Sequence, residues 1–283
     1  MIQDIGAHRF HNEYVICQPE ADSRILCYRN GEALLIKKED QLDFLHYQQL
    51  LEHTLIRGDA LIYLFRIDEI RYFLLLESEQ ILKQESEVFS NAVWSPISVF
   101  RNAALGDTAF AGITGYQLAQ WYDQRRFCPR CGRRMIQDQK ERMMRCEACN
   151  QQEYPKICPA VIVGVRKGDK LLLTRYAGRD YKKYALIAGF AEIGETIEET
   201  VQREVLEETG LHVKNIEYYK SQPWSFSSTL LMGFFADADG EEMISLDENE
   251  LSEAKWVERD EIPDDDGVSL TREMMRVFKY GKK

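Results

Sequence analysis

The first 125 residues alternate short apolar runs with polar turns, a pattern typical of a strand-rich domain. The runs predicted as strands are YVIC (14–17), SRILCY (23–28), EALLI (32–36), ALIYLF (60–65) and RYFLLLE (71–77). The segment GYQLAQWYDQRR, residues 115–126, predicts a helix that leads into a cysteine-rich stretch. We therefore expect an N-terminal α+β domain, mostly β, over residues 1–125.

The pattern changes after residue 155. CPAVIVGV and KLLLTRY predict two strands joined by the turn RKGDK, with a glycine at the bend. Further elements are predicted as a helix over 196–209, strands over 213–219 and 229–236, a strand at EAKWVE and a last helix over 269–280. We expect a small cysteine-rich module over 126–155 and a second full domain over 156–283.

Size and composition are those of a globular protein. The chain has 283 residues, of which 45% are hydrophobic and 29% are charged, enough for two domains with cores of their own. No apolar run is long enough to span a membrane, and the start MIQDIGAHRF lacks the features of an export signal, so we expect a cytoplasmic protein with no membrane partner. The net charge of −11 argues against attraction of the whole molecule to nucleic acid or anionic lipid.

Four of the seven cysteines form two CxxC pairs. Cys128 and Cys131 are separated by fourteen residues from Cys146 and Cys149. In a cytoplasmic chain such clustering indicates metal and not disulfides, and two CxxC pairs suit tetrahedral zinc. Four thiolates leave no open coordination position, so the predicted Zn²⁺ is structural.

The cysteine-rich module is locally basic. Residues 125–145 contain eight basic side chains against only Asp138 and Glu141, namely Arg125, Arg126, Arg130, Arg133, Arg134, Lys140, Arg142 and Arg145. One interpretation is that they offset the charge of a zinc tetrathiolate and solvate a small hairpin. The other is a surface that faces phosphates, as in RNA binding.

The stretch GFAEIGETIEETVQREVLEETGL, residues 189–211, predicts an acidic helix with chemical potential. Thr196 and Glu199 form a capping-box pattern, and Thr209-Gly210 is a typical helix end. At about 100° per residue, Glu204, Glu207 and Glu208 share a face and interleave with the apolar stripe Ile197, Val201 and Val205. Carboxylates placed there need a neutralising partner, and oxygen ligands select Mg²⁺ or Mn²⁺. Metal-dependent phosphate chemistry follows.

The same stretch resembles the Nudix box. Gly189-x5-Glu195-x7-Arg203-Glu204-Val205-x-Glu207-Glu208-x-Gly210-Leu211 agrees with G-x5-E-x7-R-E-U-x-E-E-x-G-U, where U is aliphatic, without a mismatch. The resemblance implies an α/β/α sandwich around a mixed sheet and hydrolysis of a nucleoside diphosphate linked to another moiety. It implies catalytic roles for Glu204, Glu207, Glu208 and Arg203, with Glu195 pairing Arg203 and the carbonyl of Ala188 as a further metal ligand.

The surroundings resemble the NADH pyrophosphatase branch of that family. SQPWSFSST, residues 221–229, is similar to its SQPWPFPxS element, and WYDQRRFCPRCG and EYPKICPAVIV follow its layout. The resemblance implies cleavage of NAD(H) to nicotinamide mononucleotide and AMP, removal of NAD caps from RNA 5′ ends, and a homodimer. Ser225 and Ser227 stand where the element has prolines, which leaves the segment less rigid.

The resemblance also assigns substrate and metal contacts by motif. Phe190 and Tyr154 would stack on bases, Glu250 would be a further metal ligand, and Arg101 and Thr271 are weaker substrate candidates. The segment that would shape the substrate pocket comprises Gln222, Pro223, Trp224, Ser225, Phe226, Ser227, Ser228 and Thr229.

Two alternatives remain open at this stage. The first is a Nudix hydrolase that acts on ADP-ribose or diadenosine polyphosphates, because fold and box host many specificities. The second is an RNA-binding protein in which the zinc ribbon carries the function and the Nudix domain senses a ligand.

Overall fold

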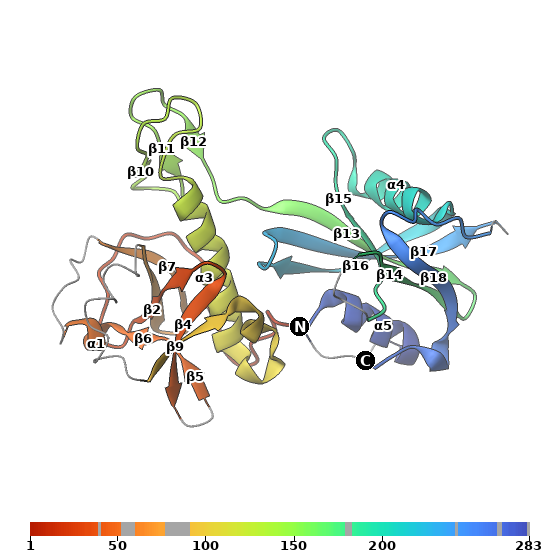
Figure 1. The fold of residues 1–283 in the computed structure, drawn as a ribbon, viewed down its shortest axis with the longest axis horizontal. Helices are drawn as coiled ribbons and strands as arrows, with labels where there is room; N and C mark the ends of the chain where they lie inside the picture. Colours follow the sequence, from red (N-terminus) through yellow and green to blue (C-terminus); the bar gives the residue numbers. More distant parts are fainter. Residues whose placement is uncertain are drawn as a thin grey trace. The chain divides into compact units, whose positions relative to one another are not determined.

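The computed structural model describes residues 1–38, 41–51, 60–76, 91–178, 183–240, 243–264 and 268–281. The chain divides into two compact units. The N-terminal unit comprises Ile2–Lys156 together with Ser225–Ser227, and the C-terminal unit comprises Met1, Ile157–Trp224 and Ser228–Lys283. Figure 1 shows the elements of each unit.

Two larger sheets form most of the N-terminal unit, as the alternating pattern of residues 1–125 predicts. The five-stranded sheet has the order β1-β7-β8-β2-β6, with bounds Phe10–His11, Leu61–Ile67, Ile70–Leu75, Arg24–Leu26 and Leu45–His46. The four-stranded sheet has the order β3-β4-β5 with β9 also paired to β4, and the bounds are Tyr28–Arg29, Glu32–Lys38, Gln41–Asp43 and Ala92–Pro96. The short helices are α1 (Tyr47–Leu51), η3 (Ile97–Arg101) and η4 (Ala103–Leu105).

One predicted strand is wrong. The run at 14–17 forms no strand, and Val15 and Ile16 are about half exposed. A strand needs a hydrogen-bonding neighbour, and this segment has none among the described strands. Tyr14 instead donates its hydroxyl hydrogen bond to the carbonyl of Asp138 at 2.8 Å.

Helix α3 spans Gly106–Gln124 and is longer at its start than the helix predicted over 115–126. Gly106, Gly112 and Gly115 are poor helix formers, so the helix propensity of this segment is low and does not predict the first turns of α3. Burial decides the outcome, because Phe110, Ala111 and other residues of these turns pack into the core of the N-terminal unit.

The cysteine-rich module is a small antiparallel sheet in the N-terminal unit. Its strands are β10 (Ile136–Gln137), β11 (Met144–Arg145) and β12 (Gln152–Glu153), in that order. Met135, Met144 and Cys146 are buried and belong to the core cluster that also contains residues of α3. The module is thus packed onto a larger core and is not isolated.

Arg142 ties this module to the neighbouring sheet. Its Nη2 donates to the carbonyl of Leu64 at 2.6 Å and to Asn12 at 3.3 Å, and its guanidinium lies 5.8 Å from the Tyr14 ring. We expect Arg142→Ala to lower the free energy of unfolding by about 2 kcal/mol, because a charge-assisted bond to a carbonyl is lost. Urea denaturation checks this against the exposed Lys140→Ala, which should change stability by less than about 0.5 kcal/mol. Equal stabilities for the two variants would contradict the assignment.

The C-terminal unit is built on a six-stranded mixed sheet. Its order is β16-β17-β13-β14-β18 with β15 also paired to β13, and β13 and β17 run parallel. The bounds are β13 Cys158–Lys167, β14 Lys170–Tyr176, β15 Ile187–Phe190, β16 His212–Trp224, β17 Thr229–Asp239 and β18 Leu251–Glu258. The predicted hairpin of β13 and β14 is confirmed, whereas β15 is a strand that the sequence pattern does not indicate.

Two helices cover opposite faces of this sheet (Figure 1). Helix α4 (Ile197–Thr209) packs Val201 and Val205 into a cluster with Val161 and Val163, while α5 (Leu270–Tyr280) packs into a second cluster that contains Ile162. Successive residues of a strand point to opposite faces, so the alternation along β13 separates the two layers. The predicted α/β/α sandwich with a mixed sheet is confirmed. A short turn, η5, spans Arg259–Glu261.

Within the described residues, no helix combines the length and the apolar character needed to cross a bilayer.

Candidate active site and zinc centre

The acidic helix begins and ends where the sequence predicts. The Thr196 side chain accepts a hydrogen bond from the Glu199 N–H at 3.3 Å, and the Glu199 carboxylate accepts one from the Thr196 N–H at 2.7 Å. This reciprocal pair satisfies two N–H groups that the first turn leaves without helical partners. Gly210 ends the helix at φ +69°, a left-handed conformation that favours glycine.

The three glutamates of α4 have unequal environments. Glu208 is 2% exposed and Glu204 is 9% exposed, whereas the Glu207 side chain is 59% exposed. The predicted interleaving of carboxylates with the apolar stripe is therefore confirmed for Glu204 and Glu208. Burial raises the pKa of Glu204, and Arg203 opposes that effect.

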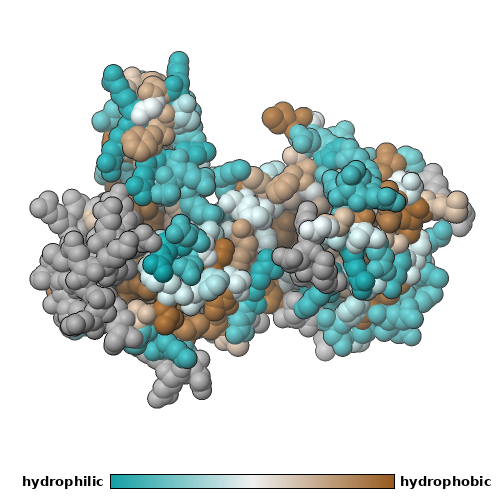
Figure 2. All heavy atoms as spheres, viewed as in Figure 1, coloured by the Kyte–Doolittle hydropathy of each residue, from teal (hydrophilic) through white to brown (hydrophobic). Residues whose placement is uncertain are grey.

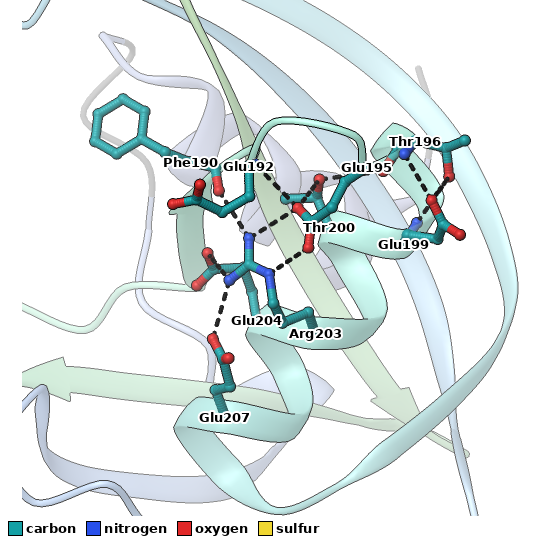
Figure 3. Close-up of polar contacts among 9 residues, drawn as sticks. All are labelled: Phe190, Glu192, Glu195, Thr196, Glu199, Thr200, Arg203, Glu204 and Glu207. Carbon is teal, nitrogen blue, oxygen red and sulfur yellow. Dashed lines mark hydrogen bonds and ion pairs between the residues drawn. The ribbon is translucent and has the colours of Figure 1, made fainter.

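Arg203 is the centre of this network. Its guanidinium makes five hydrogen bonds, as many as it has N–H groups. Nε and Nη2 hold the two carboxylate oxygens of Glu195 at 2.5 and 3.0 Å, and Nη2 also donates to the carbonyl of Phe190 at 2.9 Å. Nη1 donates to Glu204 at 2.7 Å and to Glu207 at 2.9 Å (Figure 3). One side chain thus links the end of β15, the following loop and the helix.

Glu195 fixes the loop between β15 and α4. Besides Arg203, its carboxylate accepts hydrogen bonds from the Glu192 N–H at 3.0 Å and the Thr200 hydroxyl at 2.9 Å. The bond from Arg203 is the largest cause that lowers the pKa of Glu195 to about 2. Glu195 is therefore ionised at neutral pH. Thr200 is a supporting residue that the motif leaves unassigned.

Gly189 provides the space that the Glu204 carboxylate occupies. A Cβ placed on Gly189 would lie 1.9 Å from the carboxyl carbon of Glu204 and 2.1 Å from both of its oxygens. Gly189 lies in β15 next to Ala188, which is paired with Ile162 of the neighbouring antiparallel strand β13. The first position of the box must therefore be glycine, because a Cβ there would leave no room for the Glu204 carboxylate beside the strand.

The donor set suits a hard divalent cation. Glu204, Glu207 and Glu208 carry carboxylates on one helix, and Ala188 precedes Gly189 in β15. Glu250 is exposed, and its charge is among the causes that raise the pKa of Glu204. Oxygen donors of this kind fit Mg²⁺ or Mn²⁺ and not a thiolate-selective ion.

The segment expected to shape the substrate pocket forms the end of a hairpin. Strand β16 continues through Trp224, which pairs with Thr229 at the start of β17, so only Ser225–Ser228 form the turn. Pro223 is tolerated because β16 is an edge strand. Gln222 is fully buried, donating to the carbonyl of Val268 at 3.1 Å and accepting from the N–H of Leu270 at 2.7 Å. Gln222 therefore holds the start of α5.

The turn residues group with the N-terminal unit. Ser225–Ser227 belong to that unit, and the ring of Phe226 packs against its core cluster. The guanidinium of Arg101 lies 4.7 Å from the centre of the same ring, so the structure brings together two residues that the sequence names separately. Ser228 has φ +55°, and its carbonyl accepts from the Cys158 N–H.

The side chains of the remaining candidates make none of the hydrogen bonds of the Arg203 network. Phe190 is 53% exposed, and Figure 3 shows its ring directed away from Arg203. Tyr154 is 54% exposed in the N-terminal unit and donates to Glu141 at 2.7 Å. Thr271 lies in the first turn of α5 and is partly buried. Both aromatic rings offer exposed faces on which a base could stack.

The four cysteines gather as a zinc site requires. Their sulfur atoms all lie within 4.8 Å of one another, and the Cys128–Cys149 and Cys131–Cys146 sulfur pairs are 3.5 Å apart. Tetrahedral zinc with bonds of about 2.3 Å places thiolates at about 3.8 Å from one another. In the part of the chain that the structure describes, no other group of three or more His, Cys, Asp or Glu side chains is so close.

Loss of this zinc should unfold the module. We expect one Zn²⁺ per chain by elemental analysis, and Cys146→Ser should lose it, because a structural site contributes on the order of 10 kcal/mol of binding free energy to folding. The thermal midpoint of the N-terminal unit should fall with it, since Met144 and Cys146 lie in its core. Cys158→Ser, outside the cluster, is the control. A Cys146→Ser protein with full zinc content would contradict the assignment.

Comparison with known proteins identifies both regions. Residues 123–154 match the NADH pyrophosphatase zinc ribbon domain family, and residues 156–278 match the NUDIX domain family. A crystal structure of a NUDIX hydrolase from Nitrosomonas europaea is 26% identical and covers 54% of this chain and 90% of its own, with a TM-score of 0.46.

Curated relatives align over the same part of the chain. NAD-capped RNA hydrolase NudC of Pectobacterium atrosepticum is 42% identical over 149 residues, or 53% of this chain and 57% of the relative. The protein of that name from Yersinia pestis is 43% identical over the same shares. The aligned region thus spans little more than half the length of these relatives. The four-cysteine cluster is a structural zinc site, and the chain carries an NADH pyrophosphatase zinc ribbon domain followed by a NUDIX domain.

Proposed function

We propose that this protein is a metal-dependent pyrophosphohydrolase that cleaves the diphosphate of NAD(H). The observation that carries the proposal is the network in which Arg203 holds Glu195, Glu204 and Glu207 around the glycine cradle at Gly189. It supplies fixed oxygen donors with a buried carboxylate at their centre. A purely structural acidic helix would keep its carboxylates in solvent.

Glu204, Glu207, Glu208 and the carbonyl of Ala188 would hold Mg²⁺ or Mn²⁺, with Glu250 as a further ligand. Such an ion clamps phosphate oxygens and lowers the pKa of bound water. Arg203 and Glu195 do not need to touch the substrate, because their role is to fix the loop and the helix that carry the ligands. In the reaction, one bond forms between a water oxygen and phosphorus while the bridging P–O bond breaks. The water proton leaves to a carboxylate or to solvent.

The substrate assignment is supported by the zinc ribbon domain and by what the relatives are named for. NAD(H) would yield nicotinamide mononucleotide and AMP, and the same cut would remove an NAD cap from RNA. Phe190 and Tyr154 are exposed aromatic rings suited to adenine or nicotinamide. Trp224 and Phe226 would act from the hairpin end, and Arg101 would act from η3. Thr271 remains a candidate contact.

A substrate panel tests the assignment. Initial rates with NADH, NAD, ADP-ribose and a diadenosine polyphosphate should be compared at equal concentration in Mg²⁺ and in Mn²⁺. We expect the highest kcat/KM with NADH or NAD and no turnover in a chelator. A higher kcat/KM for ADP-ribose would overturn the substrate assignment while leaving the pyrophosphohydrolase chemistry intact.

The homodimer implied by the resemblance and the cytoplasmic location expected from the sequence pattern stay predictions. Sedimentation equilibrium at several protein concentrations measures the first, and a fractionation experiment with the native host measures the second.

A further inference from the structure

The zinc ribbon has two faces of different character. Residues paired across its strands share a face, so Ile136, Arg145 and Gln152 lie together, and each is exposed. Their neighbours Met144 and Met135 are buried in the core of the N-terminal unit. The register therefore directs one face of the ribbon to solvent.

Aromatic and apolar side chains extend this solvent face. Phe127 pairs with Arg134 in an antiparallel bridge and is 61% exposed, and Ile136 is 39% exposed. Tyr154 lies one residue past β12 and is 54% exposed. In Figure 2 the ribbon, at the upper left, presents hydrophobic residues bordered by hydrophilic ones.

The basic side chains of the ribbon divide into two groups. Arg125 pairs with Glu153 at 2.9 Å, Arg126 pairs with Asp123 at 2.7 Å, and Arg142 is bonded to Leu64. The second group is exposed and has no carboxylate within ion-pair distance among the described residues, and it comprises Arg130, Arg133, Arg134, Lys140 and Arg145.

Offsetting the zinc centre does not account for the second group. A zinc ion with four thiolates carries two negative charges, and the sequence supplies five exposed cations besides the three that are used internally. Polypeptide N–H groups already stabilise the thiolates, as the Arg130 N–H does at the Cys128 sulfur. Exposed cations with exposed aromatic rings among them are the arrangement that binds single-stranded nucleic acid, through phosphates and stacked bases.

We propose that the solvent face of the zinc ribbon, Phe127, Arg134, Ile136 and Arg145, together with the exposed Arg130 and Arg133 of the adjoining cysteine knuckle, binds the single-stranded RNA that follows the cap. The identity of the strand as RNA rests on the proposed function. Tyr154, which that function assigns to a base of the cap, is an exposed residue of the same ribbon, so the strand would continue from that ring over the arginines. The whole chain has a net charge of −11, so the attraction between the protein and RNA phosphates would come from the basic ribbon alone.

The test measures binding of an uncapped single-stranded RNA of roughly 16 nucleotides by fluorescence anisotropy. Wild-type protein is compared with Arg134→Ala/Arg145→Ala, and with Arg9→Ala/Lys37→Ala as a control of equal charge change at exposed sites elsewhere in the N-terminal unit. Between roughly 50 and 200 mM salt, the ribbon variant should bind the RNA about tenfold more weakly than the wild type does. The slope of log affinity against log salt concentration should be smaller in magnitude by about 1.4, because two phosphate contacts are lost. Phe127→Leu should weaken binding by about fivefold without changing the salt slope.

Zinc content and NADH turnover should be unchanged in the ribbon variant and in Phe127→Leu, which separates this inference from the proposed function. If wild-type protein hydrolyses NADH but binds RNA no better than the ribbon variant, the inference is overturned and the proposed function stands. The inference would also be overturned if wild-type protein bound a duplex of the same sequence as tightly as the single strand, because bases in a duplex cannot stack on Phe127. Absence of NADH hydrolysis by the wild type would instead overturn the proposed function.

Discussion

Replacing Glu207 with glutamine is expected to lower NADH turnover by about a hundredfold or more, while the protein stays folded. The Glu207 side chain is 59% exposed, and its hydrogen bond to Arg203 is 2.9 Å long. Glutamine keeps the length and one acceptor oxygen but loses the negative charge that a divalent ion requires. An exposed ion pair contributes at most about 1 kcal/mol, so the thermal midpoint should barely change.

Glu198→Gln provides the matched control for this prediction. Glu198 lies on the first turn of the same helix and is exposed, so the same chemical change is made outside the network. Its turnover should equal that of the wild type. Full activity in Glu207→Gln, measured as initial rates with saturating NADH and Mn²⁺, would show that the carboxylate network has no part in the chemistry.

Gly189→Ala is expected to reduce turnover as severely as the loss of a carboxylate, on the order of a hundredfold. The new methyl group would overlap the Glu204 carboxyl group, with distances near 2 Å to all three of its terminal atoms. The end of a flexible side chain can move away at little cost to folding, but the displaced oxygens then leave the position that Arg203 fixes. Activity should therefore fall far more than stability.

Circular dichroism and the urea midpoint measure the stability of Gly189→Ala, and NADH turnover measures its function. A second variant, Gly189→Ser, should behave in the same way, because any Cβ meets the same obstacle. Unchanged turnover in both variants would show that the position of the Glu204 carboxylate does not matter. A large loss of stability with proportional loss of activity would assign Gly189 to folding alone.

Helix α4 was predictable because its determinants are local. The capping pair Thr196 and Glu199, the end at Gly210 and the positions of Glu204 and Glu208 relative to the apolar stripe follow from spacing of a few residues. The same holds for the four cysteines, since each CxxC pair supplies two ligands at a fixed separation.

Features that depend on distant partners were not predictable. Gln222 carries a sequence signal for a substrate contact, but its partners Val268 and Leu270 are more than forty residues away, and only the fold shows that it braces α5. Phe226 and Arg101 are more than a hundred residues apart in the sequence, and only the fold brings the guanidinium to 4.7 Å from the ring centre. The start of α3 is similarly decided by burial of Phe110 and not by helix propensity.

The most direct test of the central claim is identification of the products formed from NADH in the presence of Mn²⁺. The account predicts reduced nicotinamide mononucleotide and AMP in equal amounts, formed by the wild type and by Glu198→Gln but not by Glu207→Gln. Release of free reduced nicotinamide with ADP-ribose would contradict it, because the glycosidic bond and not the diphosphate would have been cleaved. Intact NADH after incubation with folded, zinc-loaded protein would contradict it equally.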